Sequence, residues 1–332
     1  MNTIKIDWLN TFLIFISFLA AFHFPFELFI LIYAILGPLH YLTEINWIRD
    51  KKYFTESKPW ALAITIFSII ITLPFVFTIA NFQNHSILTF WLNNSITLLP
   101  IAFLMAFLAL SSFAKKTKIY LFFIGAVVIL LVSLLPIYQV WIGVFLPTVI
   151  HVYLFTLLFM WYGVLKSNSG IGKFNIFLLI FLPLFLTIMK IDGSLYNAPN
   201  VLKSIFVDNK FFTLNANISK TLGLTDGKRF SFQETIFVKI QIFIAFAYTY
   251  HYLNWFSKTT IIGWHKNITK KKSMLILLVW ASSIALYFYN YKAGVAVVLF
   301  LSMLHVFMEF PLNIITIKTI ITSFKGDKKA KV

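Results

Sequence analysis

The sequence has no cysteine among its 332 residues. This absence excludes disulfide bonds, a thiolate nucleophile and an iron–sulfur cluster held by thiolates. A metal ion bound by this chain must therefore be held by nitrogen and oxygen atoms, the donors that histidine side chains, carboxylates and backbone carbonyls provide.

Charged residues are also scarce, at 12% of the chain, whereas 60% of the residues are hydrophobic and the mean hydropathy is +0.85. This composition is typical of an integral membrane protein. Acidic residues are the rarest, with 11 against 28 basic ones, and the formal charge is +17. Because the basic residues gather in short segments between apolar runs, they indicate membrane topology, and we predict no nucleic-acid partner.

Apolar runs of membrane-spanning length recur along the whole chain. Ten can be distinguished, some of them near the lower limit of ~17 residues for crossing a bilayer as a helix. The sequence therefore predicts an all-α polytopic membrane protein in which residues 1–332 form a single transmembrane domain. The runs are approximately Trp8–Phe22, Phe26–Trp47, Trp60–Ala80, Ile96–Ala114, Ile119–Leu135, Gln139–Leu165, Phe174–Met189, Ile236–Ser257, Met274–Asn290 and Gly294–Ile317.

Lysine and arginine residues cluster after every even-numbered run, for example at Arg49, at Lys115 and in the tail from Lys325 onward. Because short cytoplasmic loops carry an excess of basic residues, we predict that both termini are cytoplasmic. We expect the chain to lie in the cytoplasmic membrane of a prokaryote. The long connection 190–234 then falls on the outer side. We expect it to be a connector or a loop over the outer mouth or the membrane surface, not a folded domain.

Four histidines and two glutamates stand at membrane depth inside the apolar runs. An ionisable side chain at membrane depth costs roughly 2.5 to 3.5 kcal/mol on insertion scales, so each needs a compensating partner. Two pairs share a His-x-x-x-Glu spacing, which places both side chains on one face of a helix. The six residues are His40, Glu44, His151, His251, His305 and Glu309.

The four histidines lie on the second, sixth, eighth and tenth runs, which all cross the membrane in the same direction under the predicted topology. Each precedes the first inner basic residue of its run by seven to fifteen positions. At ~1.5 Å rise per residue, these positions lie about 10 to 22 Å from the inner boundary. One polar cluster between the midplane and the inner leaflet is therefore feasible.

A bound metal ion would compensate several of these side chains at once. Imidazole is a common ligand of iron, copper and zinc, and carboxylates either complete a coordination sphere or orient the histidines. We therefore predict a metal site formed by His40, His151, His251 and His305. Glu44 and Glu309 are candidate catalytic residues, as ligands, as partners of the histidines or as proton carriers. For any single histidine, a hydrogen bond between helices is the alternative interpretation.

These residues resemble the Brp/Blh family of bacterial and archaeal membrane dioxygenases that cleave β-carotene. The segment Gly37–Glu44 (GPLHYLTE) is similar to the family's early Gly-x-Pro-His-Gly-x-x-Asp motif, and His151 is similar in placement to a mid-chain family histidine. Tyr248–Trp255 (YTYHYLNW) resembles a late aromatic segment that bears histidines, and Leu304–Glu309 resembles the family's last helix. The resemblance implies an all-helical fold and iron held by histidines in the membrane interior.

The chain departs from the family pattern at several places. Its early proline is shifted by one position, and Glu44 replaces an aspartate. The family's late segment has two histidines four residues apart, whereas the position four beyond His251 is Trp255. The fourth ligand is therefore open: His305, Glu44 or Glu309 could take its place, or the metal site could be lost.

The leading functional hypothesis is a metal-dependent membrane oxygenase or related oxidoreductase, similar to a non-haem iron dioxygenase. Fe(II) is the expected metal, with zinc and copper as alternatives. The expected partners are membrane lipids and a hydrophobic substrate, a carotenoid, another isoprenoid or a lipid, which enters from the lipid phase. Two alternatives stay open: a proton- or ion-coupled transporter that uses the His/Glu groups, and a non-catalytic membrane scaffold. The oligomeric state cannot be predicted from the sequence.

Overall fold

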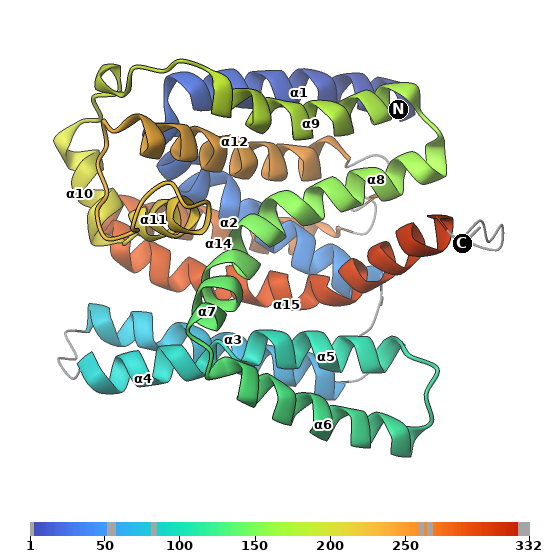
Figure 1. Cartoon of the computed structure of the whole chain (residues 1–332). Coiled ribbons are helices and arrows are strands. Elements are labelled where there is room, and N and C mark those ends of the chain that lie inside the picture. Colours follow the sequence, from blue (N-terminus) through green and yellow to red (C-terminus); the bar gives the residue numbers. More distant parts are fainter. Residues whose placement is uncertain (1–2, 52–57, 81–84, 259–261, 264–267, 325–332) are drawn as a thin grey trace. The chain divides into compact units, whose positions relative to one another are not determined.

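The computed structural model describes residues 3–51, 58–80, 85–258, 262–263 and 268–324. Within these residues the chain is helical and has no strand (Figure 1). Ten helical segments are long and apolar enough to cross a membrane. The predicted all-α architecture with ten apolar spans is thus confirmed for the described part, and these helices indicate a membrane protein. The basic tail from Lys325 lies outside the described residues, and the orientation of the termini stays a prediction.

The chain divides into two compact units, unit 1 (Met1–His40 and Val152–Lys272) and unit 2 (Tyr41–His151 and Ser273–Val332). Three helical segments cross from one unit to the other, and one of them, α14 (Lys270–Tyr289), crosses near its start, between Lys272 and Ser273. The two others cross beside histidines. One is α2 (Pro25–Lys51), whose residue His40 ends the first part of unit 1. The other is η1 (Gln139–Phe155), whose residue His151 ends the first part of unit 2. The backbone therefore passes between units directly beside two of the predicted metal ligands.

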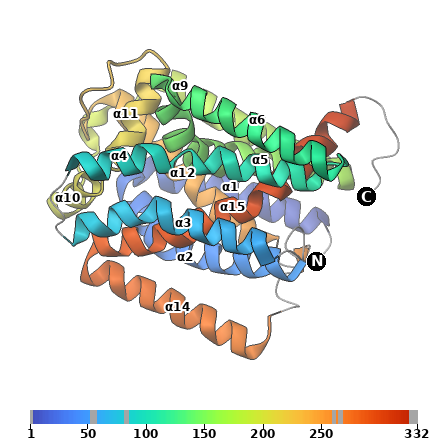
Figure 2. The same ribbon diagram turned by 90° about the horizontal axis from the view of Figure 1, so that it is seen from below.

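Unit 1 is organised around α12 (Thr235–Ser257), which packs against α1 (Thr3–His23) and α9 (Gly170–Ile188), while α8 (Thr156–Ser167) packs against α9 (Figures 1 and 2). Most of α12 is buried, because apolar side chains occupy all of its faces. Polar groups join these helices where apolar packing alone would not fix their pairing. Thr11 donates a hydrogen bond to Asn175 Oδ1 at 2.6 Å, and Tyr250 donates to Asn10 Oδ1 at 3.1 Å.

The connection between α9 and α12 is more ordered than a loop. It contains a short 3-10 turn, η2 (Gly193–Leu195), and two helices, α10 (Asn200–Asp208) and α11 (Phe212–Thr221). Phe206 is fully buried, with its ring 5.4 Å from that of Phe26 on α2. Asn215 donates a 2.9 Å hydrogen bond to Gln241 on α12. The aromatic residues of this connection therefore fold it onto unit 1, a packing that hydropathy alone does not reveal.

Unit 2 is organised around α15 (Tyr291–Phe324), which packs against α3 (Lys58–Ile79) and α5 (Leu98–Leu110). Helix α6 (Lys115–Ser133) packs against α5 and has no buried residue, so its apolar side chains are exposed along the helix. The unit also contains α4 (His85–Ser95), α7 (Pro136–Tyr138) and most of α14 (Lys270–Tyr289).

Two spans of unit 2 differ in detail from regular helices. The fourth span begins earlier than predicted, at His85, and is divided into α4 and α5 by Ile96 and Thr97. Pro100 in the first turn of α5 has no N–H group, and its ring prevents a continuous helix through the preceding residues. The sixth span contains the π-helical segment η1, with Pro147 inside it. A proline removes a backbone hydrogen bond of an α-helix and so favours a local change to π-helical geometry. In η1 this proline stands four residues before His151.

Candidate metal centre

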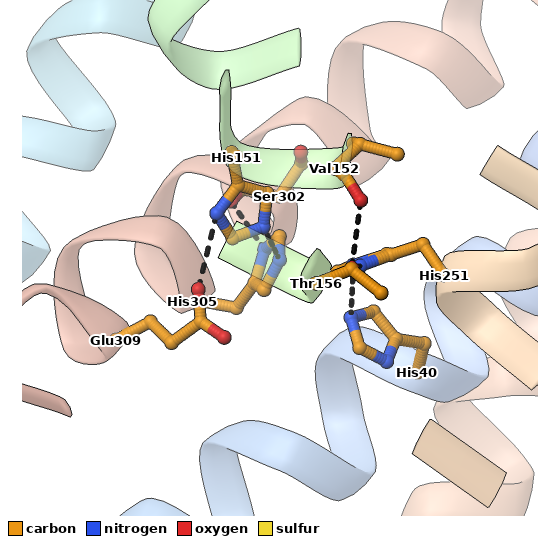
Figure 3. Close-up of polar contacts among 8 residues, drawn as sticks. All are labelled: His40, His151, Val152, Thr156, His251, Ser302, His305 and Glu309. Atoms are coloured by element: carbon orange, nitrogen blue, oxygen red, sulfur yellow. Dashed lines mark hydrogen bonds and ion pairs between the residues drawn. The ribbon is translucent and has the colours of Figure 1, made fainter. Parts of the chain in front are cut away.

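Unit 1 brings together His40 from α2 and His251 from α12. Their Nε2 atoms lie 3.1 Å apart, although the residues are 211 positions apart in the sequence (Figure 3). Both side chains are buried, with 1% and 6% of their surface exposed. The predicted convergence of these two histidines is therefore present within unit 1.

Thr156, the first residue of α8, fixes the ring of His251. Its hydroxyl oxygen is 2.7 Å from His251 Nδ1 and also 2.7 Å from the carbonyl oxygen of Val152 (Figure 3). The hydroxyl has one proton, and the carbonyl can only accept. When Thr156 donates to Val152, it accepts from His251 Nδ1–H, and the neutral ring then has its lone pair on Nε2. This lone pair faces His40.

Aromatic rings surround the His40–His251 pair. The ring of Tyr252 is 5.1 Å from that of His40, and the ring of Trp255 is 5.7 Å away and nearly perpendicular. Trp255 lies four residues beyond His251 and places its indole ring beside His40.

Unit 2 brings together His151 from η1 and His305 from α15, with their Nε2 atoms 2.9 Å apart (Figure 3). His305 Nδ1 lies 2.5 Å from the carbonyl oxygen of Ser302, which can only accept a hydrogen bond. This contact assigns the proton of a neutral His305 to Nδ1 and leaves the lone pair on Nε2. The ring of Tyr41 stacks on His305 at 4.4 Å and holds the orientation of the imidazole.

Both predicted glutamates belong to unit 2 and meet there. Glu309 Oε2 is 3.1 Å from His151 Nδ1, and the Glu44 side chain is hydrogen-bonded to that of Glu309. Both carboxyl groups are about 2% exposed. A hydrogen bond between two carboxyl groups requires a proton on one of them, so the pair carries at most one negative charge. The spacing along α15 suggests His305 as the neighbour of Glu309, but the contact in the structure is with His151.

The contacts around the His151–His305 pair have an electrostatic consequence. His151 Nδ1 lies 3.1 Å from Glu309 Oε2 in an ion-pair contact, and His305 donates from Nδ1 to the Ser302 carbonyl. When His151 also carries its proton on Nδ1, two neutral imidazoles direct two Nε2 lone pairs at each other across 2.9 Å. A positive species between them, either a proton or a metal ion, removes this repulsion.

The distances also fit a metal ion. Two imidazole nitrogens that each lie ~2.1 Å from one ion, at a right angle, are about 3.0 Å apart. The two Nε2–Nε2 distances, 2.9 and 3.1 Å, are close to this value. The buried histidines His40 and His251 of unit 1, and His305 of unit 2, each offer a nitrogen atom that could bind a metal ion. Their neutral nitrogen donors are compatible with iron, zinc or copper, and nothing in the donor set selects one of these.

Several residues near these histidines were not identified from the sequence. Thr156 orients His251, and Tyr41 orients His305. Thr156 lies on the span that carries His151, and Tyr41 lies on the span that carries His40. Asn313 follows Glu309 by one helical turn, is fully buried, and has no hydrogen-bond partner for its amide among the described residues. Asn313 could have been identified from the sequence, because it is a polar residue four positions after an intramembrane glutamate and so lies on the same helix face.

No protein-family model, curated protein or solved structure matches this chain.

Proposed function

We propose that this protein is a metal-dependent membrane oxygenase or related oxidoreductase that acts on a hydrophobic substrate. The observation that carries the proposal is the His151–His305 pair, in which both Nδ1 atoms face acceptors and both Nε2 atoms face each other. With the proton of each ring on Nδ1, such a pair favours a bound cation, because the cation replaces a contact between two lone pairs. Neutral imidazole nitrogens of this kind are the usual protein donors to catalytic iron, zinc and copper.

One metal ion held by His40, His151, His251 and His305 is the simplest arrangement compatible with the chain. His40 is joined directly to Tyr41, the residue whose ring stacks on His305. His151 is joined directly to Val152, whose carbonyl accepts from the threonine that holds His251. The two pairs are therefore linked through the backbone at two places. The depth argument from the sequence supports the same grouping.

The protein's own residues hold, orient and protect such a site. Glu309 fixes the orientation of His151, and its charge favours a bound cation, while Glu44 shares a proton with Glu309. Tyr41, Tyr252 and Trp255 cover the imidazole faces with aromatic carbon and exclude water. Fe(II) held by these histidines would supply the ability to bind and activate O₂.

The proposed substrate is a carotenoid, another isoprenoid or a lipid that enters from the bilayer. The aromatic content of the chain, 19% of its residues, supports this class because flat apolar side chains suit a conjugated or polyprenyl chain. The resemblance of the histidine segments to the Brp/Blh dioxygenases points in the same direction. The proposed location is the cytoplasmic membrane of a prokaryote with both termini inside. A reporter fused after Val332 that is active only outside the cell would contradict this orientation.

Metal analysis of the purified protein tests the proposal. We expect about one equivalent of iron per chain after anaerobic reconstitution with Fe(II), and O₂ consumption when β-carotene or another isoprenoid is added in mixed micelles. Protein treated with a chelator is the control and should consume no O₂. Protein that binds no iron, zinc or copper with micromolar or better affinity would contradict the metal site and therefore the proposed reaction.

A proton- or ion-coupled transporter is the second candidate, and the Glu44–Glu309 contact favours it. Carboxyl groups inside membrane spans mark proton relays in pumps and transporters, and here two of them, on α2 and α15, are hydrogen-bonded to each other. Asn313 extends the buried polar face of α15. Flux measurements in proteoliposomes separate the two functions. A metal-free protein that dissipates a pH gradient, and loses this activity on Glu309→Gln substitution, would replace the oxygenase proposal.

A further inference from the structure

A cavity in unit 2 has no histidine in its lining and suits a different kind of ligand from a metal ion. It has a volume of about 460 Å³, which is in the range of pockets that bind small molecules. Helices α5 and α6 provide most of its lining, and α3 and α15 contribute one residue each. The apolar part of the lining includes Met105, Ala106, Leu108, Phe122 and Pro311.

Two lysines belong to the lining of this otherwise apolar cavity. Lys115 is the first residue of α6, and Lys118 follows it by one turn. Lys118 donates a 3.4 Å hydrogen bond to the carbonyl oxygen of Ala109, another lining residue, which fixes its ammonium group beside the cavity. An apolar space with two positive charges in its lining is complementary to a molecule with a hydrocarbon chain and an anionic group.

Trp60 provides a second, independent indication. It lines the same cavity, only 8% of its surface is exposed, and its indole N–H has no hydrogen-bond partner among the described residues. A buried N–H group without a partner destabilises a protein, because it has lost its hydrogen bonds to water. An acceptor oxygen in the cavity would satisfy it. Tryptophan near a helix end is expected as an interfacial anchor, but burial distinguishes Trp60 from that role.

We infer that this cavity binds one anionic phospholipid. An acyl chain lies against Met105, Leu108 and Phe122, and the phosphate lies beside Lys115 and Lys118. Trp60 donates its N–H to a phosphate or ester oxygen. Three donors suit the several oxygens of a phospholipid better than a single carboxylate. The neighbouring helix α6 has no buried residue, so lipid is the surrounding medium, and the basic side of the predicted topology faces the anionic leaflet.

The test measures lipid retention by the full-length protein in neutral detergent, with native mass spectrometry as the readout. The probes are dioleoyl phosphatidylglycerol, dioleoyl phosphatidylcholine, oleate and inorganic phosphate, each titrated separately. We expect one phosphatidylglycerol per chain, at least tenfold tighter than phosphatidylcholine. Charge attraction raises lipid affinity about fivefold per lysine near an anionic headgroup. The double variant Lys115→Gln with Lys118→Gln should therefore lower the affinity for phosphatidylglycerol about 25-fold.

Matched controls separate this site from general attraction between charges. Lys270→Gln with Lys271→Gln removes two exposed lysines at the start of α14, which do not line the cavity, and should change phosphatidylglycerol affinity less than twofold. Ala109 is an exposed residue of the lining, and Ala109→Phe places a ring in the cavity and should lower the affinity for phosphatidylglycerol about tenfold. Trp60→Phe keeps an aromatic ring but loses the N–H group, and should lower this affinity about threefold to tenfold.

Three results would overturn the inference. The first is equal affinity for the two phospholipids. The second is equal weakening by the Lys115/Lys118 and Lys270/Lys271 variants. The third is oleate or inorganic phosphate binding as tightly as phosphatidylglycerol, which would identify a fatty acid or free phosphate as the occupant. Iron content of the same variants should equal that of the unmodified protein, so this outcome is independent of the proposed oxygenase function.

Discussion

In unit 1 the Nδ1 atom of His251 meets the hydroxyl of Thr156, whereas in unit 2 the Nδ1 atom of His151 meets the carboxylate of Glu309. The central contact is similar in both, with two Nε2 atoms about 3 Å apart. The His40–His251 pair thus has a neutral partner that sets its tautomer. The His151–His305 pair has a carboxyl partner, which when ionised also stabilises positive charge.

This difference shows how two similar pairs of ligands can contribute differently to one function. A hydroxyl orients an imidazole without changing the charge of the site. A carboxylate orients it and increases the attraction for a cation. We therefore expect substitutions around the His151–His305 pair to affect metal affinity more than equivalent substitutions around the His40–His251 pair.

The largest effect should come from removing one histidine of either pair. His305→Ala and His251→Ala should each lower metal content from about one equivalent to below about a tenth, as measured by inductively coupled plasma mass spectrometry. Each variant removes a nitrogen donor and leaves its partner imidazole without a neighbour. His85→Ala, at an exposed position on α4, is the control and should keep full metal content. If only one of the pairs is needed, the ion belongs to that pair alone.

The next effect should come from neutralising the carboxylate of the His151–His305 pair. Glu309→Gln keeps an oxygen that can accept from His151 Nδ1 but removes the negative charge. Loss of such a partner typically lowers metal affinity 10- to 100-fold. Competition with a chromophoric chelator measures this change. Glu27→Gln, a carboxylate in the first turn of α2, should leave the affinity unchanged, and an unaffected Glu309→Gln protein would contradict the role of the charge.

A smaller effect should come from removing the neutral partner of the His40–His251 pair. Thr156→Val keeps the shape of the side chain but loses the hydroxyl that is hydrogen-bonded to His251 Nδ1. The expected decrease in metal affinity is about tenfold, at the low end of the range for partners of metal ligands. Thr148→Val is a matched control, because the Thr148 hydroxyl donates only to the nearby carbonyl of Val144. A decrease as large as that of Glu309→Gln would remove the proposed difference between the pairs.

The smallest effect should come from Tyr41, which contacts His305 through its ring face. Tyr41→Phe keeps the stacked ring and should change metal affinity less than twofold. Tyr41→Leu loses the ring and should destabilise the protein by about 0.5 to 1.5 kcal/mol, the usual value of an aromatic pair beyond its area. Thermal unfolding in detergent compares the two. Equal destabilisation by both variants would show that the hydroxyl, not the ring, is important.

The sequence by itself determined the ten apolar spans and the four histidines and two glutamates at membrane depth within them. Hydropathy is a local property, and a helix in a bilayer satisfies its backbone within its own segment, so each span can be recognised without its neighbours. The division of the fourth span and the helices α10 and α11 were not predicted. They depend on a proline near a helix start and on aromatic packing between segments far apart in the sequence.

Only the tertiary structure decided which polar residues meet. Four-residue spacing places Glu44 with His40 and Glu309 with His305 on one helix face, but Glu309 contacts His151, and Glu44 contacts Glu309. The histidines pair as His40 with His251 and His151 with His305, over separations of 211 and 154 residues. Spacing along a helix fixes the direction of a side chain. Its partner is set by the helices packed against that face, and this packing depends on residues throughout the chain.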